Sequence, residues 1–74
     1  MSTYIKIKWS KDLFGKDVSV LTHSGVEIWG FKARKVYKGK ILDKVDWLVG
    51  CPVFENETGS LGVGYDCDIV EELS

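Results

Sequence analysis

The sequence is poor in the residues that carry most enzyme chemistry. Among its 74 residues it has one His, two Cys, one Pro and one Met. One His and two Cys that are not arranged as CxxC are too few to complete a zinc site. No P-loop, GxGxxG, HExxH or GxSxG motif is present. These absences predict a protein that is not an enzyme and that uses no metal, cofactor or small-molecule substrate.

Long apolar segments are also missing. No apolar run approaches the ~20 residues needed to cross a bilayer, and residues 1–12 lack the apolar segment of a secretory signal. We therefore expect a cytoplasmic protein that does not contact a membrane. In that compartment Cys51 and Cys67 are expected to be free thiols, buried or half-buried, with a single disulfide as the alternative. The hydrophobic share of 45% is typical of a globular protein, and the length suits one domain over residues 1–74.

Basic residues are absent from the last part of the chain. Residues 1–44 hold all ten Lys and Arg and four acidic residues, a net charge of +6, whereas residues 45–74 hold seven acidic residues and no Lys or Arg, a net charge of −7. Such asymmetry is typical of proteins with a charged partner. The alternative is that the two halves fold against each other and pair opposite charges on adjacent strands.

What the chain does have is alternation of apolar and polar residues, which predicts strands. A change of phase at Gly30 predicts a bend inside one strand. Residues 41–49 also fit a helical stripe, but Gly50 and Pro52 close behind them favour a strand. The predicted strands are residues 3–9, 17–22, 26–37, 41–49, 53–55 and 61–70. The predicted turns are residues 22–25, 38–40 and 55–60, with a single helical or 3-10 turn at residues 10–15.

The densest group of cations lies in residues 31–40, "FKARKVYKGK". Lys32, Arg34 and Lys38 would share one face of the predicted strand, about 6–7 Å apart, with two aromatic residues close by. This surface could bind an acidic protein, hold nucleic-acid phosphates while its aromatics stack on bases, or be an ordinary solvated strand face. The predicted partner-binding residues are Trp29, Lys32, Arg34, Lys35, Tyr37, Lys38 and Lys40.

A second charged surface is predicted near the C-terminus. Asp66 and Asp68 lie two residues apart on the polar face of the predicted strand 61–70, and Glu71 and Glu72 follow. Two carboxylates at this spacing could bind a cation or act as acid and base. Glycines on the same face leave no walls for a pocket, so a solvent face or an acidic docking surface is favoured.

Cys67 lies on the opposite face of that predicted strand. It alternates in phase with Leu61, Val63, Tyr65 and Ile69, so the whole set is expected to be buried. Burial in apolar surroundings raises the pKa of a thiol, and we therefore predict that Cys67 reacts slowly with thiol reagents.

The strand pattern predicts a small antiparallel barrel or sandwich. The segments "GKDVSVLTHSGVEIWGFKARKVYKG" and "GCPVFENETGSLGVGYDCDIVEEL" resemble an SH3-like barrel in layout, with a hairpin turn near Gly25, a long strand bent at Gly30 and a final strand near the C-terminus. The resemblance covers most of the chain. It implies a mainly β fold, a small antiparallel barrel of five or six strands with one or two short helical turns.

The size, the divided charge and the lack of catalytic residues are also similar to those of small phage-encoded proteins that redirect a host machine, such as modulators of RNA polymerase in transcription and anti-CRISPR inhibitors. This similarity implies a non-enzymatic binding module that regulates or inhibits a larger protein assembly by surface contact in the host cytoplasm. The alternative function is a nucleic-acid-binding barrel that works through residues 32–40. A structural subunit or assembly partner is a third class.

Overall fold

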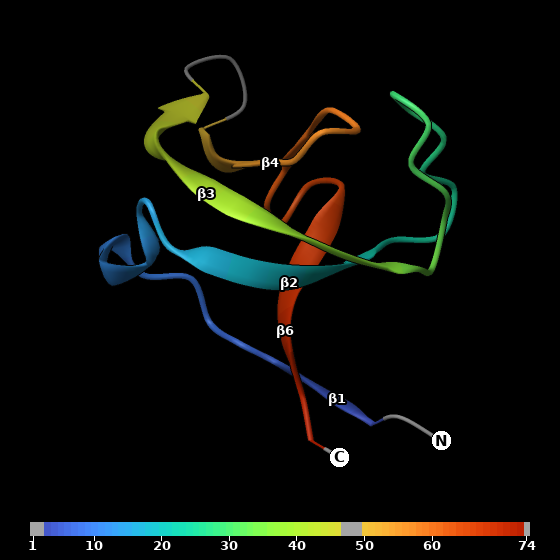
Figure 1. Cartoon of the computed structure of the whole chain (residues 1–74), viewed down its shortest axis with the longest axis horizontal. Helices are drawn as coiled ribbons and strands as arrows, with labels where there is room; N and C mark the ends of the chain where they lie inside the picture. The colour runs from blue at the N-terminus through green and yellow to red at the C-terminus, as the bar shows by residue number, and fades with distance from the viewer. Residues whose placement is uncertain (1–2, 47–49, 74) are drawn as a thin grey trace.

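Six antiparallel strands form the sheet of the computed structural model, which describes residues 3–46 and 50–73 (Figure 1). The strands are β1 Tyr4–Lys6, β2 Asp17–Thr22, β3 Val36–Asp46, β4 Cys51–Glu55, β5 Ser60–Gly62 and β6 Cys67–Glu72, and they are accompanied within those residues by one 3-10 turn, η1 Lys11–Leu13. Their order across the sheet is β1-β6-β2-β3-β4-β5. The predicted mainly β fold, with five or six strands and a short helical turn, is confirmed.

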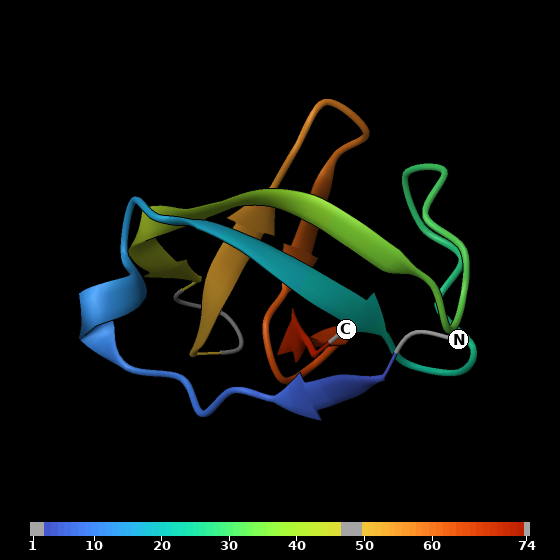
Figure 2. The same cartoon turned by 60° about the horizontal axis from the view of Figure 1, so that its bottom comes forward.

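The sheet curls so strongly that it forms a half-barrel, with the β4–β5 hairpin crossing behind β2 and β3 (Figure 2). Just after β5, Val63 bridges to Cys67 at the start of β6. The N–H of Gly64 also donates a hydrogen bond of 2.6 Å to the Cys67 carbonyl. The concave face encloses one apolar core. Its buried members are Val20, Val26, Phe31, Ile41, Phe54, Leu61, Val63, Cys67 and Ile69.

The central strands follow the alternation of the sequence closely. β2 covers residues 17–22 as predicted, and Val20 and Thr22 point into the interior. β3 extends the predicted strand 41–49 backwards and confirms it as far as Asp46. Residues 47–49 of that prediction lie outside the described residues.

The predicted turn at residues 38–40 is wrong, because these residues lie inside β3. Gly39 serves packing there. A Cβ at this position would collide with the carbonyl of Glu55 and would come within 2.7 Å of the Phe54 ring. A glycine between two lysines suggests a turn, but here it lets β4 approach β3 closely.

The predicted strand 26–37 is also wrong, because the chain does not become a strand until Val36. Trp29, Gly30 and Arg34 have φ angles of 57°, 86° and 58°. These left-handed conformations interrupt an extended chain, so residues 23–35 form a loop. We call this segment the basic loop.

The predicted strand 61–70 is two strands, β5 and β6, separated by a turn. Gly64 has a φ of 89° at this turn, and the side chain of Asp66 accepts the Gly62 N–H at 2.9 Å. The other end of the sheet is shorter than predicted, because residues 3–9 contribute only the three residues of β1. Ile5 in β1 is 41% exposed, whereas Ile7 packs partly buried against the core.

Candidate functional site

The fold separates the seven predicted partner-binding residues into two groups. One group lies in the basic loop and the other on β3. Because residues 26–35 are not a strand, the predicted row of Lys32, Arg34 and Lys38 on one strand face does not exist. The loop group is Trp29, Lys32, Arg34 and Lys35, and the β3 group is Tyr37, Lys38 and Lys40.

Buried Thr22, at the end of β2, holds the base of the basic loop. Its hydroxyl accepts the N–H of Lys35 at 2.9 Å and donates to the carbonyl of Lys32 at 2.6 Å. The main-chain N–H of Thr22 donates to the Lys35 carbonyl at 3.0 Å, and the Thr22 carbonyl accepts the N–H of Arg34 at 3.2 Å. These bonds satisfy polar groups of the loop and hold its cationic residues at one end of the sheet.

Phe31 fixes the middle of the loop in the core. Its side chain is 1% exposed and meets the ring of Tyr37 edge-to-face, with 4.8 Å between the ring centres. The Tyr37 hydroxyl accepts the N–H of Lys32 at 2.8 Å. Tyr37 therefore supports the loop from inside, and its ring is engaged in packing.

Trp29 contrasts with Phe31, because it is 67% exposed in a conformation that bulky side chains rarely adopt. Its Cβ rests against the β4–β5 turn. A Cβ on Gly59 would lie 2.6 Å from the Trp29 Cβ, so the glycine leaves the space that Trp29 occupies. A left-handed non-glycine residue costs on the order of 1–3 kcal/mol, and such strain is concentrated at functional sites.

Tyr65 is a second exposed aromatic side chain, 68% accessible, in the turn between β5 and β6. It was predicted to be buried in an unbroken strand, and Gly64 before it was the sequence signal for a turn. Trp29 and Tyr65 both line a shallow groove of about 260 Å³. Its other lining residues are Val53, Ser60, Leu61, Gly62 and Asp66. We call this feature the aromatic groove.

Charged residues of both signs are close in the sequence to the residues that form the aromatic groove. Lys32, Arg34 and Lys35 follow Trp29 in the basic loop, and all are exposed. Glu27 precedes Trp29 and is exposed as well. The β4–β5 turn that contacts Trp29 adds exposed Glu57, and Asp66 lines the groove itself.

The predicted acidic surface is not one continuous strip. The Asp66 carboxylate accepts a main-chain N–H in a turn. Asp68 pairs with Lys6 at 3.5 Å and with the Nε2 of His23 at 3.1 Å. Exposed Glu71 and Glu72 are adjacent on β6 and therefore point to opposite faces. Within residues 3–46 and 50–73, His, Cys, Asp and Glu form no cluster of three that could hold a metal ion.

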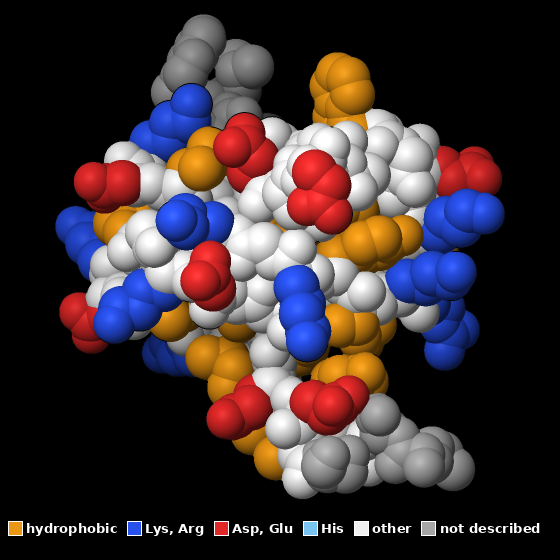
Figure 3. All heavy atoms as spheres, in the orientation of Figure 1, with side chains coloured by type: hydrophobic (Ala, Val, Ile, Leu, Met, Phe, Trp, Pro, Cys, Tyr) orange, Lys and Arg blue, Asp and Glu red, His pale blue; other side chains and the backbone are white. Residues whose placement is uncertain are grey.

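The fold interleaves the basic and acidic halves of the chain. β6, from the acidic half, lies between β1 and β2, and β4 lies beside β3. Lys40 is consequently opposite Glu55 in the β3–β4 register and opposite Asp17 in the β2–β3 register. Lys and Arg side chains accordingly alternate with Asp and Glu side chains over the face seen in Figure 3. Direct ion pairs are nevertheless few among the described residues, because Lys6 is the one Lys or Arg that pairs with a carboxylate, and Lys32, Arg34 and Lys35 of the basic loop enter none.

The thiols match their predicted burial. Cys67 is fully buried and Cys51 is half-buried, and neither forms a disulfide. Burial raises the pKa of Cys67 to about 12, and the negative charges of Asp66 and Asp68 add to this effect. Slow labelling of Cys67 stays a prediction.

No protein-family model, curated protein or solved structure matches this chain. In the part of the chain that the structure describes, no helix is long and apolar enough to span a membrane.

Proposed function

We propose that this protein is a non-enzymatic, SH3-like binding module that attaches to a larger protein assembly through the aromatic groove and regulates or inhibits that assembly, in the manner of a phage-type accessory protein. Trp29 is the central contact, Tyr65 is the second aromatic contact, and the basic loop forms a charged rim. The proposal rests on one observation above the others. Trp29 is strained and mostly exposed, so its indole stabilises the fold little and is held ready for a partner.

The chemistry of this surface suits a protein interface. Trp, Tyr and Arg dominate the binding energy of protein interfaces, where a central aromatic residue is surrounded by a polar rim. Trp29 and Tyr65 would fill apolar pockets of the partner. Lys32, Arg34 and Lys35 would meet acidic residues and mainly accelerate association.

A nucleic-acid partner is the second candidate, because an exposed indole beside several cations can stack on bases. Three carboxylates favour the protein partner. Asp66 lines the aromatic groove, and the exposed Glu27 and Glu57 lie two residues from Trp29 and from its contact Gly59 in the sequence; these carboxylates would repel the phosphates of a strand crossing the groove. A protein surface can match charges of both signs.

Affinity capture with and without nuclease tests the proposal. The wild-type chain, Trp29→Ala and Tyr65→Ala would be immobilised and exposed to lysate of the cells in which the protein is made. Lys38→Ala is the control, because Lys38 is a cation on β3 outside the basic loop. We expect wild type and Lys38→Ala to retain the same proteins after nuclease, and the two aromatic variants to lose them. Equal capture by all four chains would contradict the proposal.

Titration of labelled single-stranded and duplex oligonucleotides at low salt separates the two candidates. We expect negligible binding. Tight binding would favour the nucleic-acid module if two conditions hold. The logarithm of the association constant should fall with the logarithm of the salt concentration, by roughly 0.7 per phosphate contact on single strands. The binding should also be lost when Lys32, Arg34 and Lys35 are changed to Ala.

A further inference from the structure

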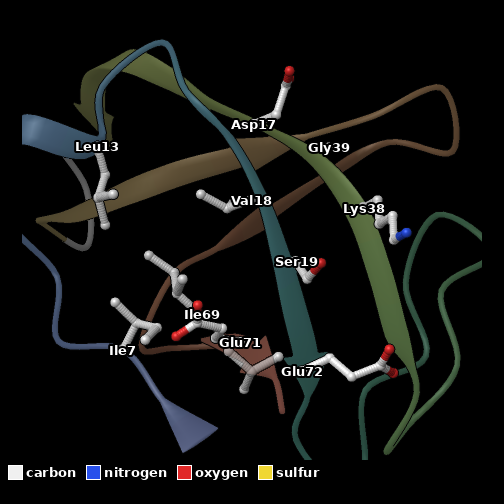
Figure 4. Close-up of a pocket in the computed structure, with 11 residues that line it drawn as sticks. Ile7, Leu13, Asp17, Val18, Ser19, Lys38, Gly39, Ile69, Glu71 and Glu72 are labelled. Carbon is white, nitrogen blue, oxygen red and sulfur yellow. The ribbon is translucent and has the colours of Figure 1, made fainter. Parts of the chain in front are cut away.

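The sheet splits at one end and opens a groove on the molecule far from Trp29. β2 and β6 pair from Ser19–Val70 to Thr22–Cys67. Beyond Ser19, β2 continues beside β3 and β6 continues beside β1. The two ribbons diverge, and a groove of about 740 Å³ lies between them (Figure 4). We call it the split groove.

The split groove has an apolar interior. Leu13 from η1, Val18 from β2 and Ile7 after β1 point toward the space between those elements, and Ile69 of β6 lies beside them (Figure 4). Leu13, Val18 and Ile7 are only partly buried. An occupant with a large apolar side chain would therefore remove apolar surface from water.

The rim of the split groove is mainly acidic. Asp17, Glu71 and Glu72 line it, the last two with side chains that leave β6 in opposite directions, and Lys38 is the cationic lining residue (Figure 4). The three carboxylates are exposed and enter no ion pair with other described residues. An apolar groove with this rim favours a segment whose apolar side chains are accompanied by cations.

The basic loop of this chain has that chemistry. Ile28 and Trp29 are its exposed apolar residues, Lys32, Arg34 and Lys35 follow them, and Glu27 before them is the one acidic residue of the loop. The loop cannot reach the split groove of its own molecule. It leaves β2 after Thr22, whereas the groove lies at the opposite end of that strand.

We propose that the split groove receives the basic loop of a second copy of this chain. Trp29 and Ile28 of one copy contact the apolar interior of the other, and the loop cations meet Asp17, Glu71 and Glu72. The contact is head-to-tail, because the copy that gives its loop keeps a free groove and the copy that gives its groove keeps a free loop. Such a contact produces chains of increasing length unless the geometry closes them into a ring.

Charge-swap variants of the purified protein test this assembly in sedimentation experiments at low salt. One variant, Lys32→Glu with Lys35→Glu, has an acidic loop; the other, Glu71→Lys with Glu72→Lys, has a basic rim. All four positions are exposed, so both variants are expected to fold, which circular dichroism would verify. Asp43→Lys, an exposed position on β3, is the control.

We expect the average mass of wild type and Asp43→Lys to rise with concentration above the monomer mass of 8.3 kDa and to fall back on addition of salt. Each charge-swap variant alone should remain a monomer. An equimolar mixture of the two should associate again, because the basic loop of one fits the acidic rim of the other.

A wild-type chain that stays monomeric up to millimolar concentration would overturn the proposal. So would charge-swap variants that associate as wild type does, or a mixture that does not associate. The experiment uses no other protein, so it neither supports nor contradicts the regulatory function proposed above.

Discussion

Two neighbouring turns at one end of the molecule are built on opposite principles. The β4–β5 turn, residues 56–59, uses residues that suit it. The Asn56 side chain accepts the N–H groups of Thr58 and Gly59 at 2.8 and 3.3 Å, and the main chains of Asn56 and Gly59 exchange hydrogen bonds. Asn and Gly are favoured in turns for these reasons.

The basic loop beside it places Trp29 and Arg34 in left-handed conformations that glycine would adopt more readily. Its buried residues, Val26 and Phe31, serve the fold, whereas its strained residues are exposed. The comparison suggests that residues 56–59 are optimised for folding and that the exposed part of the basic loop is optimised for contact with another molecule. The following changes test this difference, starting with the largest expected effect.

Phe31→Ala should destabilise the protein most. Removing a buried Phe costs about 3–5 kcal/mol, which is a large part of the stability of so small a domain. The ring also supports Tyr37 and Phe54. Urea unfolding measures the loss, and Lys32→Ala next to it should stay within about 0.5 kcal/mol of wild type. A loss below 1 kcal/mol at Phe31 would show that the loop is not held by the core.

Gly59→Ala should cost about 1–3 kcal/mol, because the added methyl group has no space beside Trp29. Trp29→Gly removes the obstructing side chain and should recover the steric part of that loss. The double-mutant cycle therefore measures the contact between the two turns. Additive effects of the two changes would contradict the packing described for them.

Asn56→Ala should cost about 1 kcal/mol, since the turn loses side-chain hydrogen bonds to two N–H groups and the amide no longer donates to the Lys38 carbonyl. Glu57→Ala, one residue further along the exposed turn, is the matched control and should be neutral. If Asn56→Ala were as stable as wild type in thermal unfolding, the turn would not depend on the Asn56 side chain.

Trp29→Gly should have the smallest effect on folding and a large effect on binding. Relief of the left-handed strain is partly offset by the lost contact with Gly59, so we expect the free energy of unfolding to stay level or to rise by up to about 1 kcal/mol. Partner capture should be lost. A destabilisation above 2 kcal/mol would show that Trp29 serves the fold, and the functional interpretation of its strain would then be wrong.

The sequence by itself determined which residues prefer an extended chain and a buried side. Strand alternation and turn signals depend only on residues that are close together in the sequence. β2, the 3-10 turn and the burial of Cys67 and Ile69 were therefore predicted correctly. For the candidate site, the sequence predicts several of the residues but not their arrangement in space. The sequence predicts Trp29 and the basic residues as contacts but places them on a strand, and it predicts a buried Tyr65, which is exposed.

The tertiary structure decided where strands end and which charges meet. Gly39 lies inside a strand against Phe54, whereas Gly64 has a φ of 89° in a turn. Glycine permits both conformations, so the packing of residues that are distant in the sequence decides which one each glycine adopts. The charge pattern depends on distant pairing in the same way. The insertion of β6 between β1 and β2 brings Asp68 to Lys6 and to His23 at the start of the basic loop, because strand register joins residues that are far apart in the sequence.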